Sequence, residues 1–506
     1  MQDENLVSTP SSPVLESAQS AAATLVKNTL YFLASSTIVS ILSFIFNVFV
    51  VRRLGDERYG LYNTALAYAA IFSIIGDLGM TQYVTREIAR GRKTADEMFW
   101  NVACVRLILA AVATLFITLS AAFIADYEPT MVWGIFLLCL SYFIFAFYGP
   151  MQLVLTAHER VDYGSTLNAV NQLFFVLAGT VVLVLGIPFH GLIVASYIGL
   201  PISAIIGIRY IRRLKLAKLK FHVTPREWLP ILWHSLPFAI ITFTIMAATD
   251  LDTVILSLNR SPEEVGWYKA AYNLTQRFLF IPMAVVTPLT PQMSRHFGLS
   301  KERVHQTFNT VIKFMATVSM PIGVGISVLA EPITRLLYGE SYLPSVPVLA
   351  ILIWTIPLLS LSWICGSLTT ASDKEKKAAR VYFFAFLLNL SANLYVVPRY
   401  GYVGAAITTV ATEAAALVMF YMVLHTDFPL TDVKNTIMKP VSAGLLMGLV
   451  IFLLRDWNML MLIPIGAVVY SGTLFLLHPF NEWEWEVIKG FQAKFTGRLR
   501  RLRATP

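Results

Sequence analysis

LGDERYGLYNTAL, residues 54–66, returns later in the chain as RSPEEVGWYKAAY, residues 260–272. Each copy follows a long apolar run. Identical residues stand at one constant spacing in the two copies, namely Glu57, Gly60, Tyr62 and Ala65 in the first and Glu263, Gly266, Tyr268 and Ala271 in the second. The repeat predicts a chain built from two related halves. A duplicated bundle of membrane helices, with a site between the repeats, is typical of transporters rather than enzymes.

The composition is that of a membrane protein. Of 506 residues, 56% are hydrophobic and 14% are charged, whereas the charged fraction of soluble domains is about 25%. The net charge of +9 would suggest a nucleic-acid partner in a soluble domain, but here it is assigned first to loops on one side of the membrane, and no nucleic-acid partner is expected. The three cysteines form no CxxC pair, so we predict no disulfide framework and no zinc site. No other metal and no cofactor are expected.

Apolar runs long enough to cross a hydrocarbon core of about 30 Å predict an all-α, multi-pass membrane protein with about 14 transmembrane helices. The runs lie at residues 28–51, 62–80, 99–125, 130–150, 167–187, 190–208, 232–258, 268–293, 308–330, 343–368, 381–397, 402–424, 437–454 and 459–477. We assign the first six to an N-lobe at residues 27–225 and the next six to a C-lobe at residues 226–425. The additional pair lies in residues 426–480.

A second sequence echo supports this division. IPFHGLIVA, before the sixth predicted helix, resembles VPRYGYVGA, before the twelfth. Because six helices separate equivalent positions, both lobes begin on the same side of the membrane, and the repeats are parallel.

The distribution of basic residues predicts the orientation. If the N-terminus is cytoplasmic, most of the 39 Lys and Arg fall in inner loops and tails, as expected for a protein of the cytoplasmic membrane with both termini inside. The basic stretch at residues 209–220 is then an inner linker lying on anionic headgroups, with a protein-partner site as the alternative.

The two ends of the chain are predicted to be cytoplasmic tails. Residues 1–26 contain no Lys or Arg and read as a disordered tail, not as a cleavable signal peptide. Residues 481–506 are basic and place apolar residues at helical spacing, which favours an interfacial amphipathic helix. A merely basic inner tail is the alternative.

Charged side chains inside predicted spans are candidate functional groups, because each costs roughly 2.5–3.5 kcal/mol at mid-bilayer. Asp77, near the inner end of the second helix, can pair with Arg106 in the third. The alternatives are an ion pair that stabilises the N-lobe and a role in binding cargo. Asp77 is also a candidate for coupling transport to an ion.

Asp250 and Asp252 lie in the seventh helix, and Arg277 lies at a similar depth in the eighth. Two residues along a helix are separated by about 200° around its axis, so the two carboxylates cannot both face one cavity unless the helix unwinds. We predict that one pairs with Arg277 and the other faces a central cavity.

Glu413 lies near the middle of the twelfth helix among small residues. Small neighbours allow close helix packing, which favours an interhelical hydrogen bond from a protonated carboxyl group. The functional alternative is a coupling site for H⁺ or Na⁺, and we keep both.

The repeated segments, GDLGMTQYVTREIARGRK at residues 76–93, LYGESYLPSVPVL at residues 337–349 and PRYGYVGAA at residues 398–406 together resemble the Wzx-like polysaccharide-transport family. This family of lipid-linked oligosaccharide flippases belongs to the multidrug/oligosaccharidyl-lipid/polysaccharide (MOP) exporter superfamily. The resemblance covers roughly residues 27–425.

The resemblance implies two six-helix lobes that form a V around a central cavity, plus two extra helices. It implies a flippase for cell-surface polysaccharide biosynthesis, which moves a polyprenyl-(pyro)phosphate-linked oligosaccharide across the cytoplasmic membrane by alternating access. Arg277 matches the position of a cavity arginine in lipid II flippases. On this basis Arg106 and Arg277 are candidate diphosphate contacts. Asp250 and Asp252 are candidate cavity residues, and one of Asp250, Asp252 or Glu413 is expected to tune the arginines or couple them to an ion. The expected partners are the lipid-linked glycan, the bilayer, a coupling H⁺ or Na⁺ and other polysaccharide-assembly proteins.

Other functions remain as alternatives. A MATE-like or lipid II exporter would belong to the same superfamily. A membrane glycosyltransferase or polymerase could use the Asp250 and Asp252 pair to bind metal, but all predicted outer loops are short. A scaffold would need purely structural intramembrane charges. No GxxxxGK[ST] motif occurs, so the energy is expected from an ion gradient, the membrane potential or the substrate gradient.

Overall fold

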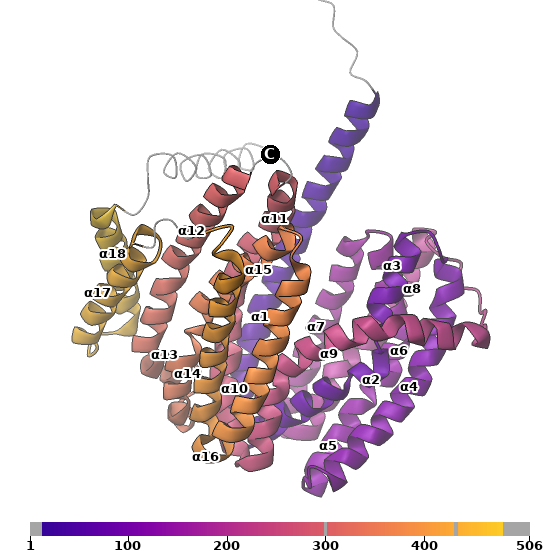
Figure 1. Ribbon diagram of the computed structural model, residues 1–506. Helices are drawn as coiled ribbons and strands as arrows, with labels where there is room; N and C mark the ends of the chain where they lie inside the picture. Colours follow the sequence, from indigo (N-terminus) through magenta and orange to yellow (C-terminus); the bar gives the residue numbers. More distant parts are fainter. Residues whose placement is uncertain (1–12, 298–300, 430–433, 479–506) are drawn as a thin grey trace, which may run out of the picture. The chain divides into compact units, whose positions relative to one another are not determined.

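The computed structural model describes residues 13–297, 301–429 and 434–478, and every regular element in these ranges is helical (Figure 1). In them, 9 helices are long and apolar enough to cross a membrane, or up to 11 if each bent helix pair is one span. The all-α multi-pass fold is confirmed. The count of about 14 spans remains a prediction.

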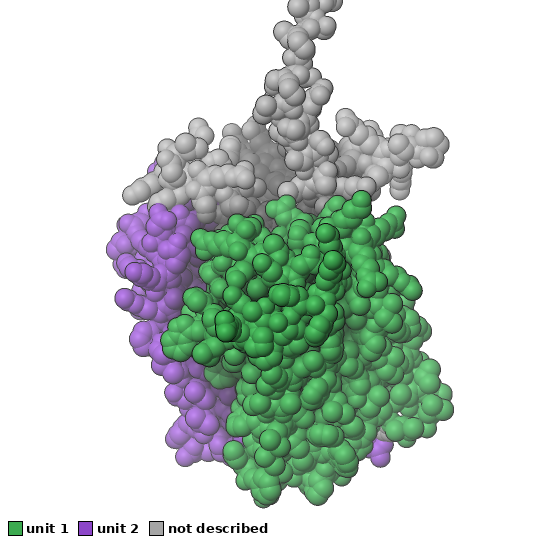
Figure 2. Space-filling model, turned by 90° about the vertical axis from the view of Figure 1, so that its right-hand side faces the viewer, with its two compact units in different colours: residues 1–54, 65–247 green, residues 55–64, 248–506 purple. Residues whose placement is uncertain are grey.

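The chain divides into two compact units, coloured separately in Figure 2. Unit 1 comprises Met1–Leu54 and Ala65–Ala247, and unit 2 comprises Gly55–Thr64 and Ala248–Pro506. This division by contacts falls at Ala247, whereas the sequence-based lobe boundary lies at residue 225. The assignment of six helices to each lobe remains a prediction.

The helices of unit 1 follow the chain, beginning with α1, which also passes through unit 2. They are α1 (Pro13–Phe72), α2 (Ile74–Asp77), α3 (Met80–Ala89), α4 (Ala95–Phe123), α5 (Pro129–Cys139), α6 (Ser141–Ala157), α7 (Val161–Val184), α8 (Pro188–Arg213), the 3-10 turn η1 (Pro225–Glu227) and the first part of α9 (Trp228–Asn259). The helix α1 begins at Pro13, inside the predicted N-terminal tail, where several alanines favour a helix. Residues 1–12 and 481–506 of the predicted tails lie outside the described ranges.

Unit 2 contains the rest of α9 and the helices that follow it. They are α10 (Pro262–Gln276), η2 (Arg277–Leu279), α11 (Phe280–Phe297), α12 (Lys301–Val328), α13 (Ala330–Leu337), η3 (Glu340–Ser345), α14 (Val346–Leu352), α15 (Thr355–Ala371), α16 (Glu375–Leu424), η4 (Lys434–Met438), α17 (Lys439–Leu453) and α18 (Met459–Leu477). The predicted additional pair corresponds to α17 and α18. Both pack on α12, where Val324 meets Met447 and Leu462 in one apolar cluster.

Two long helices break at a glycine where the sequence predicts a loop between spans. The backbone of α1 leaves the helical region at Gly55 (φ 72°), and that of α16 leaves it at Gly401 (φ 59°). Glycine adopts positive φ without the steric cost of a Cβ atom. The predicted helix pairs on either side are therefore joined through tight kinks.

Within unit 2, residues 55–64 of the first repeated segment pack against the second segment at residues 260–272. A Cβ atom on Gly60 would overlap the carbonyl oxygen of Pro262, and one on Gly266 would overlap that of Asp56. The contact is reciprocal, because Gly60 and Gly266 are equivalent in the repeat and so are Asp56 and Pro262. Each glycine thus permits the main chain of the other copy to approach.

The kink at Gly401 lies against the second copy. The guanidinium of Arg260 donates a hydrogen bond to the carbonyl oxygen of Pro398 (2.9 Å), and the backbone N–H of Tyr402 donates one to Glu264 (3.3 Å). The two sequence echoes of the C-terminal half are therefore packed together.

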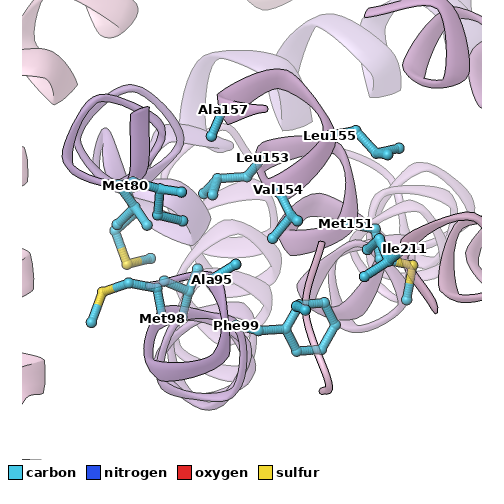
Figure 3. Packing of buried hydrophobic residues seen from close by; sticks show 14 of the residues in the cluster. Met80, Ala95, Met98, Phe99, Met151, Leu153, Val154, Leu155, Ala157 and Ile211 are labelled. Atoms are coloured by element: carbon cyan, nitrogen blue, oxygen red, sulfur yellow. The ribbon is translucent and has the colours of Figure 1, made fainter. Parts of the chain in front are cut away.

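The core of unit 1 fills the space between α3, α4 and α6 (Figure 3). Met80, Met98, Phe99 and Val154 are all at most 3% exposed there. Burying such a side chain contributes about 1.5–3 kcal/mol. This packing fixes α4, which carries Arg106.

The basic linker after α8 is bound to the start of α4. The backbone N–H of Leu219 donates a hydrogen bond to Asp96 (2.8 Å), and the Trp100 indole donates one to the carbonyl of Leu219 (3.1 Å). Further along, the N–H of Thr224 donates to Asn101 (2.8 Å). These contacts hold the linker on unit 1 while Lys215 and Lys218 remain exposed.

Candidate functional site

A polar cluster of unit 2 surrounds Asp252, which is 2% exposed. Its carboxylate accepts hydrogen bonds from the Tyr268 hydroxyl (3.0 Å), the Asn393 amide (2.7 Å) and the Thr409 hydroxyl (2.7 Å). These partners come from α10 and from both sides of the kink in α16. A buried carboxylate needs such donors, because leaving it unpaired is costly.

The network continues along α16. The Asn393 amide also donates to the side-chain oxygen of Asn389 (3.1 Å), and Asn389 donates to Thr412 (3.3 Å). The side-chain oxygen of Asn393 is buried without a hydrogen-bond partner. Carboxylate, amide and hydroxyl oxygens therefore lie together, and hard cations prefer such oxygen donors.

Asp250 takes a different partner from Asp252. Its carboxylate pairs with the amine of Lys269 (3.0 Å), which is 6% exposed and also lies 5.0 Å from the ring centroid of Tyr272. The expectation that the two aspartates face different surroundings is confirmed. The expectation that one of them pairs with Arg277 is wrong, because Lys269 occupies that role.

Arg277 lies where α10 gives way to the 3-10 turn η2. Its side chain is half-buried, and its charge acts on Tyr338. No carboxylate forms an ion pair with it among the described side chains. Of the two predicted arginines, Arg106 is paired with a carboxylate and Arg277 is not, within the described residues.

Glu413 lies on α16 one helical turn beyond Thr409 and is half-buried. It interacts electrostatically with Asp252, so two carboxyl groups share one region. Within the described ranges its side chain makes no hydrogen bond, so the interhelical hydrogen bond that the sequence suggests is not seen.

In unit 1, Arg106 and Asp77 form the ion pair that the sequence predicts. Arg106 is 2% exposed, and it also donates to the Thr81 hydroxyl (2.6 Å) and lies 5.6 Å from the ring centroid of Phe145. Gly149 leaves room for the guanidinium, because a Cβ atom there would overlap it. The Asp77 carboxylate, 21% exposed, is the more accessible partner.

Two guanidinium nitrogens of Arg106, Nε and Nη1, are buried without a hydrogen-bond partner. One carboxylate and one hydroxyl thus leave part of its donor capacity unused. This unused capacity is compatible with either alternative for the pair, a lobe-stabilising contact or a contact to an anionic ligand.

Local sequence determines where α4 begins and how the loop before it is held. Thr94 caps the helix by accepting a hydrogen bond from the N–H of Glu97 (3.3 Å), and the Glu97 carboxylate accepts one from the N–H of Thr94 (2.9 Å). This capping box fixes where the helix begins. In the same loop Lys93 binds Glu227 (2.9 Å), and this contact raises the pKa of the Lys93 amine.

Seven polar residues of the two clusters were not among the predicted site residues: Thr81, Tyr268, Lys269, Asn389, Asn393, Thr409 and Thr412. Tyr268 and Lys269 lie inside the repeated segment, close in sequence to Asp250 and Asp252. This proximity was the one signal that could have identified them as partners of the aspartates. Thr81 lies in the segment at residues 76–93 that carries the family resemblance, and the remaining four are uncharged residues of α16 outside the quoted segments.

Two family models match the chain. A model described as polysaccharide biosynthesis protein matches residues 25–297. A model described as lipid II flippase MurJ matches residues 163–469. The two matches overlap and together include both charged clusters.

One similar protein is the Haloferax volcanii protein named "Probable low-salt glycan biosynthesis flippase Agl15". It is 24% identical over 455 residues, which cover 87% of this chain and 93% of that protein. The similarity therefore extends over nearly the full length of both proteins.

Solved structures show the same fold. A lipid II flippase MurJ in an inward closed conformation aligns with a TM-score of 0.70 at 15% identity, covering 89% of this chain and 99% of that one. An inward-facing multidrug resistance MATE family transporter of the MOP superfamily aligns with a TM-score of 0.62 at 14% identity, covering 79% and 98%. At such low identity the likeness concerns the fold alone.

Proposed function

The chain belongs to the family of polysaccharide biosynthesis proteins, and we propose that it is a flippase for a polyprenyl-(pyro)phosphate-linked oligosaccharide. The flippase name of the Haloferax relative supports this function, since the two proteins align over most of their lengths. The main structural support is the cluster of charged and polar side chains that lie together around Asp252 on apolar helices. Intramembrane charges of this kind mark transport pathways.

The cargo explains why a protein needs such groups. A sugar-pyrophosphate head is multiply charged and strongly hydrated, so it cannot cross hydrocarbon at a useful rate. Arginine donors can replace part of its hydration, because the guanidinium matches phosphate oxygens in two-point contacts. The polyprenyl tail can remain in the bilayer while the head moves, as alternating access requires.

Arg277 is the proposed main contact to the diphosphate. It is half-buried and has no carboxylate partner among the described residues, so its charge is available to a ligand. Arg106 is a second candidate through its unused nitrogens, although it binds Asp77. Asp250 and Asp252 are proposed to position the polar side chains of the site. Asp250 does so by pairing with Lys269, and Asp252 by accepting hydrogen bonds from its three donors.

The energy is proposed to come from a coupling ion, H⁺ or Na⁺. Asp252 and Glu413 share one region, and an H⁺ or Na⁺ would reduce the repulsion between two carboxylates there. The oxygen of Asn393 that lacks a donor supports this location as well. Asp77, partly exposed beside Arg106, is the candidate in unit 1.

We place the protein in the cytoplasmic membrane with both termini inside, on the distribution of its basic residues. The lipid-linked glycan and the bilayer are its proposed partners, with other polysaccharide-assembly proteins beside them.

Export of lipid II is the second candidate, because the MurJ family model matches residues 163–469. The two cargoes share a polyprenyl diphosphate and differ in the glycan. Depletion distinguishes them, since the lipid-linked glycan that accumulates identifies the cargo.

The test replaces Arg277 by Ala, with Arg335→Ala as the matched control. Arg335 lies on α13 of the same unit, is half-exposed, and pairs with Glu331 and Glu340. We expect Arg277→Ala to reduce surface glycan and accumulate inward-facing lipid-linked sugar at normal protein level, and Arg335→Ala to do neither. Unchanged translocation in Arg277→Ala would refute the role of this arginine, and accumulation of no lipid-linked sugar on depletion would refute the flippase function.

A further inference from the structure

A groove with a volume of about 500 Å³ opens in unit 2 between the two arms of α16, at the end opposite the Gly401 kink. Its first wall comes from the arm that begins at Glu375. Lys377, Arg380 and Phe384 line it at a spacing that places them on one helix face. This wall therefore changes from cationic at the helix start to aromatic further along.

The second wall comes from the returning arm of α16. Met419, Met422 and Thr426 line it at the same helical spacing, with Thr426 just beyond the helix end. Methionine side chains adapt to irregular apolar ligands. Phe384 is 56% exposed and Met422 is 63% exposed, so the apolar part of the groove is open along its length.

The polar end of the groove carries uncompensated positive charge. Lys377 and Arg380 are exposed, and neither forms an ion pair with a described carboxylate. The nearby acid Asp427 is already paired with Lys374. A ligand with one anionic group therefore finds two free cations there, which suits a phosphate bound by arginine and lysine.

We propose that this groove binds an anionic phospholipid of the bilayer. The phosphate lies at Lys377 and Arg380, and an acyl chain lies along Phe384 and Met422. The occupant is charged at one end and apolar along the rest, as the groove is. Lys and Arg at a membrane surface attract anionic lipids in this way.

The location agrees with this occupant. The distribution of basic residues predicts that the start and end of α16 lie at the inner surface of the membrane, where anionic headgroups are attracted to cations. The groove shares no residue with the groups proposed to bind the cargo or the coupling ion. Its failure would therefore leave the proposed flippase function untouched.

The experiment measures binding of dioleoylphosphatidylglycerol to the purified full chain by native mass spectrometry, with phosphatidylcholine as the neutral lipid. In the double variant K377Q/R380Q we expect binding of one phosphatidylglycerol to weaken by roughly twenty-five-fold, since each cation contributes a factor of about five. Binding of phosphatidylcholine should not change. The control R399Q/R455Q removes the same charge from exposed arginines in two predicted outer loops and should retain this lipid.

A second variant tests the apolar wall without changing charge. Met422→Trp fills the open groove, and we expect it to weaken phosphatidylglycerol binding although both cations remain. Equal binding in the wild type, K377Q/R380Q and R399Q/R455Q would overturn the proposal. It would also be overturned if K377Q/R380Q lost polyprenyl monophosphate but kept phosphatidylglycerol, because the groove would then hold the glycan carrier.

Discussion

The reciprocal contact of the two repeated segments can be tested by glycine-to-alanine substitutions. We expect this substitution to lower the stability of the protein at the contact and to raise it at an open helical position. Gly60→Ala and Gly266→Ala each place a Cβ atom onto a main-chain oxygen of the other segment, Pro262 or Asp56. A main-chain atom cannot turn aside as a flexible side chain can. Gly472→Ala in α18 is the control, because a Cβ atom there meets nothing within 4 Å.

The expected magnitude combines two effects. Alanine in place of glycine inside a helix stabilises by up to about 1 kcal/mol, and overpacking costs about 1–3 kcal/mol. Because the overlap is with backbone, we take the upper part of that range, which leaves a net loss of about 2 kcal/mol. Gly472→Ala should gain a few tenths to about 1 kcal/mol.

The assay is thermal unfolding of the purified protein in one detergent at one scan rate, since membrane proteins rarely unfold reversibly. At about 2–4 °C per kcal/mol, Gly60→Ala and Gly266→Ala should each lower the apparent Tm by roughly 4–8 °C. The double variant should lose less than the two losses added, because one displacement relieves both overlaps. If both single variants melt at or above Gly472→Ala, the close packing of the repeats is refuted.

Three further substitutions test the charged clusters by the same unfolding assay. Lys269→Ala should cost about 3 kcal/mol, the lower end for a broken buried pair, because it leaves the Asp250 carboxylate, 20% exposed, without its partner. Adding Asp250→Asn should recover most of the loss, and an equal loss in the double variant would contradict the pairing. Asp77→Asn should cost a similar amount by leaving the Arg106 charge buried, and adding Arg106→Met should restore stability, whereas additive losses would show that the two residues are independent. Tyr268→Phe removes one donor to the buried Asp252 carboxylate and should cost about 1.5–3 kcal/mol, so an unchanged Tm would argue against that hydrogen bond.

The sequence predicted the features that depend on long patterns. Apolar runs indicated a helical membrane protein, and the repeated segments indicated a duplication, because both signals extend over many residues. The kinks at Gly55 and Gly401 were predicted as loops between spans. In the structure a single glycine with positive φ is enough to change the direction of the helix. Pattern length alone does not show whether a break is a loop or a kink.

The pairing of charges was predicted less well. Asp77 and Arg106 were matched correctly because each was the nearest intramembrane charge of opposite sign to the other. Lys269 lies at the start of the eighth predicted span, at residues 268–293, and was not considered among the intramembrane charges, although it is 6% exposed beside Asp250.

The uncharged residues of the clusters could not be predicted from the positions of charges in the sequence. Asn393 and Thr409 lie far from Asp252 in sequence, and the tertiary packing of α16 against α9 and α10 brings them to it. Neither residue type is unusual in a membrane helix. Their role follows only from the three-dimensional contacts.

Reconstituted vesicles offer the most direct test of the central claim. The purified protein would be placed in liposomes with a polyprenyl-diphosphate oligosaccharide, and the fraction of glycan accessible to an external glycosidase would be followed over time. We predict that the wild type and Arg335→Ala equilibrate the glycan between leaflets and that Arg277→Ala is slowed by at least about tenfold, which corresponds to ~1.4 kcal/mol. Equal rates in protein-containing and protein-free vesicles, with an ion gradient applied, would contradict the claim that this protein is a flippase.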